Sequence, residues 1–116
     1  MIGGNTTVQI QINHGHVKNK IGEKEKEWKT ADRLTGWIDL SSGESGYTTF
    51  NTKIQESTHI FISDYKKLDK KIRAENSRVI DKNGLIYDVM LIDDPMEMHK
   101  QLEIYLKYTG GQLDVS

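Results

Sequence analysis

The chain has 116 residues, 35% of them hydrophobic and 28% charged, and its formal net charge at pH 7 is −1. This length suits one domain with a hydrophobic core, and the balanced charge gives no general attraction to nucleic acid or acidic membranes. The absence of cysteine excludes disulfides, a thiol nucleophile and a thiolate metal site. No apolar run reaches membrane-spanning length, and we expect no signal peptide because the start lacks the charged and apolar regions that one needs.

The first strand is predicted over Thr6 to His14, after a loose start at residues 1–5. Apolar and polar residues alternate along it, which is typical of a half-buried strand. Residues 15–30 are polar and alternate Lys with Glu, so they form either a solvated ribbon with Trp28 as its anchor in the core, or a flexible loop. The positions expected to face inward are Val8, Ile10 and Ile12.

Two further strands are predicted in the middle of the chain, over Arg33 to Ser41 and over Ser57 to Tyr65. In the first, Gly36 indicates a bulge or a bend, and Trp37 lies opposite an apolar face. In the second, Ile60 and Ile62 are expected to face inward, with His59 and Phe61 on the other face. The apolar face of the earlier strand consists of Leu34, Gly36, Ile38 and Leu40.

Residues 65–76 are either one turn of helix or an irregular connector, since Leu68 and Ile72 are spaced four apart. The remainder reads as a three-stranded meander. Asn83-Gly84 predicts a two-residue type I′ hairpin turn, in which both residues need a positive φ. The strand over 85–92 is apolar on both faces, as a central strand is, and Asp93-Asp94-Pro95 ends it. The last strand turns Leu102, Ile104, Leu106 and Tyr108 to one face, and residues 112–116 form a flexible tail.

These elements predict an all-β or mostly β fold for residues 1–116. We expect a small barrel or sandwich of about six or seven antiparallel strands with at most one short helix. A long loop follows the second firm strand, over residues 41–56. It is rich in Ser, Gly and Thr but also holds Tyr47, Phe50 and Ile54, so it is either mobile or ordered only against a partner.

Catalytic motifs are weak in this sequence. His14 and His16 could bind a metal with Asp93, Asp94 or His99, but only if the first and last strands are neighbours. Asp93 and Asp94 could act as an acid–base pair, but two aspartates directly before a proline more often form a turn. A nucleophile elbow, a P-loop and a dinucleotide-binding loop are absent. We therefore expect neither catalytic nor metal-binding residues, and no cofactor.

Nucleic-acid binding is the alternative function that the residues suggest. A basic stretch from Lys66 to Arg78 could contact phosphates, although a solvated connector is the commoner role of such a run. Four aromatic residues could stack bases on a small barrel, but aromatics at strand spacing are more often core. The candidate contact residues, for DNA or for another subunit, are Lys66, Lys67, Lys70, Lys71 and Arg73, and the four aromatics are Trp37, Tyr47, Phe50 and Phe61.

From about Trp28 to Tyr108, the order of features resembles the head-closure, or head–tail joining, proteins of tailed bacteriophages. Trp28 leads into a strand with Trp37-Ile38-Asp39-Leu40, followed by Ser42-Gly43-Glu44 and a loop. After the basic connector come Arg78-Val79-Ile80, the Asn-Gly turn and Tyr87-Asp88-Val89. The ending, from Ile92-Asp93-Asp94-Pro95-Met96 to Leu102-Glu103-Ile104-Tyr105, is most similar to versions from phages and prophages of Gram-positive bacteria. The charged insertion over 15–27 departs from the family pattern, as does Ser63-Asp64-Tyr65, where many relatives carry an arginine.

The resemblance implies a non-enzymatic virion protein at the head–tail interface, made and assembled in the bacterial cytoplasm. It implies a compact β-barrel that forms a homo-oligomeric ring below the portal and its adaptor protein, closes the DNA-filled head and docks the tail. The implied partners are further copies of the chain, the adaptor, a tail-completion or tail-terminator protein and the end of the packaged DNA, with no membrane. The family's channel gate would correspond to the loop residues Ser42, Gly43, Glu44, Ser45, Gly46, Tyr47, Thr48, Thr49 and Phe50.

Overall fold

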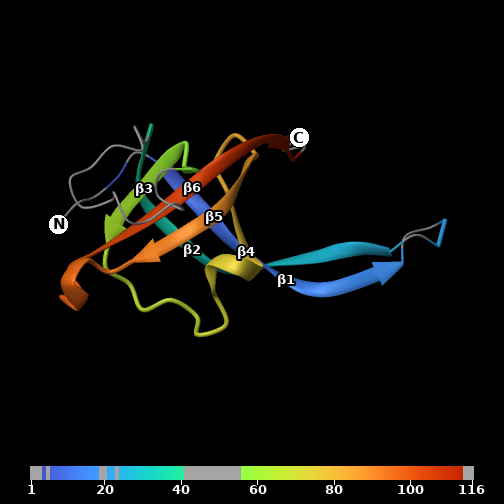
Figure 1. The fold of residues 1–116 in the computed structure, drawn as a ribbon, viewed down its shortest axis with the longest axis horizontal. Helices are drawn as coiled ribbons and strands as arrows, with labels where there is room; N and C mark the ends of the chain where they lie inside the picture. Colours follow the sequence, from blue (N-terminus) through green and yellow to red (C-terminus); the bar gives the residue numbers. More distant parts are fainter. Residues whose placement is uncertain (1–3, 5, 19–20, 23, 41–55, 114–116) are drawn as a thin grey trace.

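The computed structural model describes residues 4, 6–18, 21–22, 24–40 and 56–113, which form one closed antiparallel sheet (Figure 1). The order around the barrel is β1-β2-β3-β6-β5-β4, and β4 returns to β1. The helical elements within the described residues are two short 3-10 turns, η1 (Ala74–Asn76) and η2 (Pro95–Glu97), and Glu56 is a single helical residue at the edge of a described range. The predicted all-β barrel is thus confirmed. Its strands are β1 (Thr6–Lys18), β2 (Lys24–Leu40), β3 (His59–Asp64), β4 (Ser77–Ile80), β5 (Leu85–Asp93) and β6 (Gln101–Gln112).

The core fills the interior of the barrel with side chains from all six strands. The inward faces predicted for the first and last strands are confirmed for β1 and for β6 as far as Leu106, whereas Tyr108 is 36% exposed. On β2, Leu34 is buried, but Leu40 lies at the strand end and is 74% exposed. The core cluster consists of Val8, Ile10, Leu34, Phe61, Val79, Tyr87, Val89, Leu102, Ile104 and Leu106.

On β3 the predicted inward and outward faces are exchanged, so this prediction is wrong. Phe61 is fully buried in the core, whereas Ile60 and Ile62 are partly exposed on the outer face. The run Ile60-Phe61-Ile62 is apolar in both phases, so alternation alone cannot choose between them. In the barrel, Ile62 lies opposite Trp37 on the outside, and the larger Phe61 ring fills the interior.

Gly36 lies in a regular part of β2, so of the two predicted alternatives, a bulge or a bend, the bulge is not formed. It pairs with Thr6 on one side and Ser63 on the other, without a register shift next to it. A Cβ on Gly36 would lie 2.2 Å from the carbonyl oxygen of Ile62 and 2.9 Å from the ring of Phe61. Glycine is therefore required because two strands and an aromatic ring approach closely here.

The hairpin between β4 and β5 forms where predicted, but not with the predicted turn. Gly84 has φ +82, whereas Asn83 is not among the residues with positive φ, which excludes type I′. The Gly84 N–H donates to the Asp81 carbonyl at 3.0 Å, and Asp81 N–H donates to the Leu85 carbonyl at 3.1 Å. The loop is therefore one residue longer, with its single left-handed residue at the glycine.

Beyond the barrel, β1 and β2 continue as a two-stranded ribbon, which extends away from the other strands in Figure 1. Pairing of β4 with β1 ends at Ile12, and pairing of β3 with β2 begins only at Gly36. The extended ribbon is therefore confirmed over the loop alternative. Trp28 is not part of the core; its ring instead lies under the guanidinium of Arg78, at 4.3 Å.

The connector between β3 and β4 is irregular apart from η1, as one of the two alternatives predicted. Leu68 and Ile72 pack partly buried against the core and fasten this connector to the barrel. At the C-terminal end, β6 extends to Gln112, and Leu113 N–H donates to the Gly84 carbonyl at 2.8 Å. Ordered structure therefore reaches into residues that the sequence assigned to a tail.

The phase of β3 can be tested with Phe61→Ala and Ile62→Ala. Removing the buried Phe61 ring leaves a cavity, so we expect a loss of about 3–5 kcal/mol in the free energy of unfolding. Ile62 is partly exposed, so its truncation should cost about 1 kcal/mol or less. Urea denaturation measures both values, and equal losses for the two variants would contradict the observed phase.

Candidate functional site

The proposed gate residues 42–50 lie outside the residues that the structure describes. The connector carrying Lys66, Lys67, Lys70, Lys71 and Arg73 is described, and all five side chains are exposed. Lys66 pairs with Asp32 of β2, and Arg73 lies 3.5 Å from Glu75. Lys67, Lys70 and Lys71 make no ion pair with any described residue.

Lys66 fixes the connector to the barrel rather than offering a charge to a ligand. Its ammonium donates to the Asp32 carboxylate and, at 3.4 Å, to the Arg33 carbonyl. Burial of Asp32 is the largest single effect and opposes ionisation, but the hydrogen bond and charge of Lys66, together with the backbone hydrogen bonds from Arg33 and Asp69, outweigh it, so the pKa of Asp32 is lowered. The three unpaired lysines therefore remain as the charged surface of this connector.

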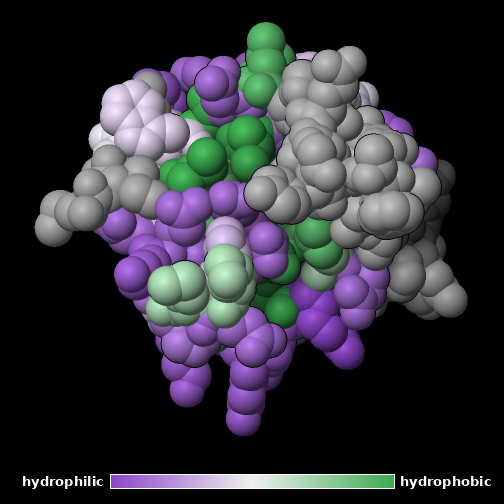
Figure 2. All heavy atoms as spheres, turned by 60° about the vertical axis from the view of Figure 1, so that its left-hand side comes forward, coloured by the Kyte–Doolittle hydropathy of each residue, from purple (hydrophilic) through white to green (hydrophobic). Residues whose placement is uncertain are grey.

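The outer surface of β2, β3, β6 and β5 carries a group of partly exposed apolar and aromatic residues. Cross-strand pairing sets Trp37 beside Ile62, Ile60 beside Tyr105, and Tyr105 beside Leu91. We call these five residues the apolar band. Trp37 is 45% exposed and the others are partly exposed. Figure 2, which turns this side of the molecule forward, shows apolar side chains gathered between hydrophilic ones.

Carboxylates lie next to the apolar band on the same strands. Asp39 lies opposite Ile60, Glu103 lies opposite Ile62, and Asp93 pairs with Glu103. Tyr105 Oη donates to Glu103 Oε1 at 3.2 Å, and burial together with the charges of Glu103 and Asp93 raises the pKa of Tyr105 to about 12. None of the three carboxylates forms an ion pair with a residue in the described part of the chain.

Sequence reasoning missed this face because it placed Ile60 and Ile62 inside the barrel. A signal for it is present in the sequence, since alternation with the inward residues Leu34, Ile104 and Leu106 turns Trp37 and Tyr105 outward. Their meeting with the two isoleucines depends on the β2–β3 and β3–β6 pairings, which join segments far apart in the chain.

The turn from Asp94 to His99, which joins β5 to β6, extends two methionines into solvent. Met96 is 88% exposed and Met98 is 51% exposed. Met96, Glu97 and His99 have φ values of 55, 55 and 54, a left-handed conformation that costs about 1–3 kcal/mol per non-glycine residue. The Asp94 carboxylate holds the turn by accepting from His99 N at 3.0 Å and contacting His99 Nδ1 at 2.5 Å.

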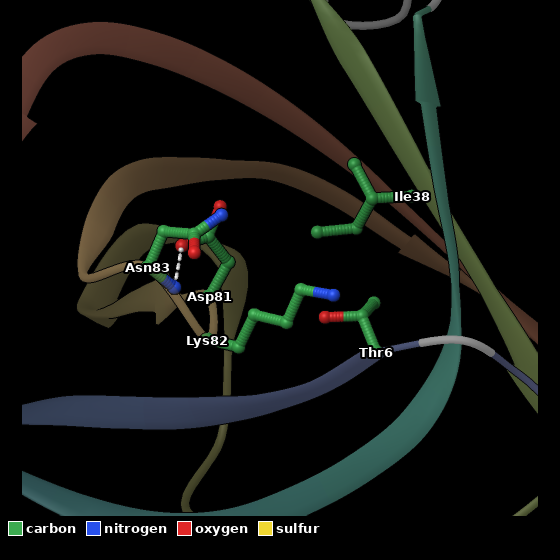
Figure 3. Close-up of a pocket in the computed structure, with 5 residues that line it drawn as sticks. All are labelled: Thr6, Ile38, Asp81, Lys82 and Asn83. Carbon is green, nitrogen blue, oxygen red and sulfur yellow. Dashed lines mark hydrogen bonds between the residues drawn. The ribbon is translucent and has the colours of Figure 1, made fainter.

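At the opposite end of the barrel, an open pocket of about 180 Å³ lies between the start of β1, the end of β2 and the β4–β5 turn (Figure 3). It is lined by Thr6, Ile38, Asp81, Lys82 and Asn83. Asp81 is already occupied in the fold: it accepts from the backbone N–H groups of Asn83 at 2.8 Å and Leu85 at 3.0 Å. It also accepts from Tyr87 Oη at 3.0 Å, so this carboxylate serves the hairpin rather than a substrate.

An aromatic network packs beside this end. His59 lies edge-on to Tyr87 at 5.1 Å and to Tyr108 at 6.4 Å, and the two tyrosine rings are 5.6 Å apart. The Thr58 hydroxyl bonds His59 Nδ1 and accepts from Tyr108 N–H at 2.7 Å. Burial, aided by the hydrogen bond to Asp81, raises the pKa of Tyr87 to about 12. The network joins β3, β5 and β6, and it has the satisfied contacts of a structural cluster.

The metal alternative loses its geometric premise. β1 lies between β2 and β4, while β6 lies between β3 and β5, so the first and last strands are not neighbours. Among the described residues, no group of three potential ligands comes together. Asp94 instead closes its own turn with His99, whose ring stacks on Tyr65 at 4.6 Å.

The base-stacking surface considered from the sequence is not assembled either. Phe61 is fully buried, so it cannot stack on a base. Trp37 lies on the outer face, on the same strand as Asp39 and across β3 from Glu103. Tyr47 and Phe50 are outside the described residues. The aromatic part of the nucleic-acid hypothesis therefore lacks support from Phe61 and meets carboxylates near Trp37.

The comparisons with known proteins inform the fold alone. No protein-family model matches the chain, and no curated protein matches it. A solved structure, the solution structure of protein SF1141 from Shigella flexneri 2a, is similar with a TM-score of 0.64 at 16% identity. The match covers 97% of this chain and 98% of that one. Within the described residues, no helix is long and apolar enough to span a membrane.

Tyr87 and Tyr105 should make stability fall at high pH, because the fold raises the pKa of both phenols. The pKa of about 12 for Tyr87 and Tyr105 in the fold exceeds the ordinary value of 10.0, so folding favours the neutral phenols. Their contribution is complete below pH 10.0 and is lost as the pH rises towards about 12.

Urea denaturation at about pH 7 and about pH 11 should therefore show a smaller alkaline loss in the Tyr87→Phe, Tyr105→Phe double variant than in the unmodified protein. At neutral pH, Tyr87→Phe alone should cost about 1 kcal/mol through the lost bond to Asp81. An identical alkaline loss in the double variant and the unmodified protein would contradict the role of these phenols.

Proposed function

We propose that this protein is a structural subunit of the head–tail connector of a tailed bacteriophage. It assembles as a ring below the portal and adaptor, closes the DNA-filled head and provides the surface on which the tail docks. Two lines support the proposal: the ordered sequence features from Trp28 to Tyr108, and a compact barrel of the kind that the resemblance implies. The partners are further copies of the chain, the adaptor and a tail-completion protein.

The ordered sequence features carry the proposal, and the structure adds the ribbon formed by the outer parts of β1 and β2, which carries residues of the charged insertion over 15–27. The ribbon stands clear of the barrel along the molecule's longest dimension, which is 49 Å against 28 and 27 Å for the others. A two-stranded ribbon by itself is at best marginally stable in water, because it has neither a second layer nor a third strand. Such an element gains stability against a neighbouring protein, which an assembly subunit has and a solitary enzyme does not need.

The polar side chains of the described residues support the same function. Asp81 is saturated by donors from its own hairpin, and Asp94 is used to close its own turn. The apolar band and the two exposed methionines instead provide surface for contact with another macromolecule. A connector subunit acts by such contacts and requires no catalytic group.

Nucleic-acid binding through the basic connector is the competing function. Nucleic-acid binding is favoured by the exposed lysines Lys67, Lys70 and Lys71, which form no ion pair with a described residue. The carboxylates beside Trp37 and the formal net charge of −1 oppose it, because neither attracts a phosphate backbone.

Electron microscopy of lysates tests the connector function directly. From a phage or induced prophage that lacks this gene, we expect separate tails beside heads that have lost their DNA, because nothing closes the portal channel. Supplying the intact gene from a plasmid should restore joined virions, and the same plasmid with an early stop codon is the matched control. Intact virions in normal number without the gene would refute the proposal and leave DNA binding as the function to test.

A further inference from the structure

The outer face of the barrel has the composition of a surface that binds lysine side chains. Trp37 and Tyr105 supply aromatic rings, Ile60 and Ile62 supply aliphatic surface, and three carboxylates lie beside the apolar band. A lysine has a long apolar stem and a charged end, so its stem packs on the apolar band while its ammonium reaches a carboxylate or a ring face. The carboxylates are Asp39, Asp93 and Glu103.

The turn beside this face indicates that the surface is built for contact. Met96, Glu97 and His99 are held in left-handed conformations, and the hydrogen bonds from His99 to Asp94 maintain them. The turn keeps Met96 and Met98 in solvent, where neither stabilises the isolated chain by burial. Strained backbone that exposes adaptable apolar side chains is typical of a binding element, and this turn follows directly from Asp93.

The chain itself carries a partner for this face. Lys67, Lys70 and Lys71 are exposed on the β3–β4 connector and have no ion-pair partner among the described residues. Lys66, Leu68 and Ile72 fasten the same connector to the barrel, so the three lysines are presented on a supported segment. The three cations equal these three carboxylates in number and are opposite to them in charge.

We infer that the outer face of β2, β3, β6 and β5 binds Lys67, Lys70 and Lys71 of a second copy of this chain. Because the two patches differ, each copy offers one to the neighbour ahead and the other to the neighbour behind. Such a head-to-tail contact closes into a ring when the rotation between copies fits. The inference rests on the proposed connector function, for which it identifies the surface between subunits.

Zero-length cross-linking tests the contact even when association is brief. Equal amounts of protein labelled with nitrogen-14 and nitrogen-15 are mixed, treated with a carbodiimide and analysed by mass spectrometry. We expect mixed-isotope links that join Lys67, Lys70 or Lys71 to Asp39, Asp93 or Glu103. Links confined to single copies, or mixed-isotope links elsewhere only, would overturn the inference.

Charge-reversal variants test the direction of the contact. The connector variant Lys67→Glu, Lys70→Glu, Lys71→Glu keeps a normal face, and the face variant Asp39→Lys, Glu103→Lys keeps a normal connector. Each alone should lose the mixed-isotope links, whereas their mixture should recover links between the unchanged face of the first and the unchanged connector of the second, and between the two reversed patches. In sedimentation, the mixture should associate while each variant alone stays monomeric, because both pairs of patches in the mixture have opposite charges.

Lys82→Glu is the matched control, because Lys82 is exposed in the β4–β5 turn and lies outside the two patches. It should leave the links unchanged, and thermal melts should establish that every variant remains folded. A mixture of the two patch variants that gives no links overturns the inference. The same holds if the connector variant loses salt-sensitive affinity for a duplex oligonucleotide while self-association is unchanged, which would assign the lysines to DNA.

The results separate this inference from the proposed function. Lysates with open heads and detached tails, combined with no recovery of links in the mixture, would retain the connector function and place the subunit contact elsewhere. Recovered links together with normal virions in the absence of the gene would retain the self-association and refute the connector function.

Discussion

Closure of the sheet depends on the pairing of β1 with β4. Gln9 to Ile12 pair with Ser77 to Ile80, which joins the start of the chain to its last third. Without this contact, β1 and β4 would present open strand edges, and the interior would be open on one side. With it, Val8, Ile10 and Val79 are sealed in the core with Phe61 and Ile104. The remaining features of the surface are positioned by this closed barrel.

Closure also determines where the protein can contact others. A closed barrel has no edge strand to extend, so association must use faces, turns or the part of the chain that leaves the barrel. The β1–β2 ribbon leaves it because pairing of β1 with β4 stops at Ile12 while β1 and β2 stay paired. The apolar band, the Met96 turn and the lysines of the connector are the other surfaces that such a scaffold offers.

The polar groups fall into two sets with different roles. Asp81, Asp94 and Asp32 are tied to donors within the chain and hold a hairpin, a turn and the connector in place. Asp39, Asp93 and Glu103 form no ion pair with a described residue, and neither do Lys67, Lys70 and Lys71. One patch is negative and the other is positive, and neither is neutralised by ion pairs within the described part of the chain. These charges therefore suit a contact between two copies better than they suit the stability of one copy.

The sequence by itself determined the fold class, the inward faces of β1 and most of β6, and the position of the β4–β5 hairpin. These features depend on alternation and turn residues within a few positions of one another, and local patterns report them reliably. The sequence did not determine the loop length at Gly84, where the Asp81 side chain supports a longer turn.

Three features depend on the tertiary structure: which face of β3 points into the barrel, the requirement for glycine at position 36, and the assembly of the apolar band. Ile60-Phe61-Ile62 is apolar in both phases, so the choice depends on which side chain fills a barrel interior built by the other strands. Gly36 is required by the backbone of Ile62, which is distant in the chain. The band exists because β3 lies between β2 and β6, and the order of strands in a sheet is a property of long-range pairing that no local periodicity contains.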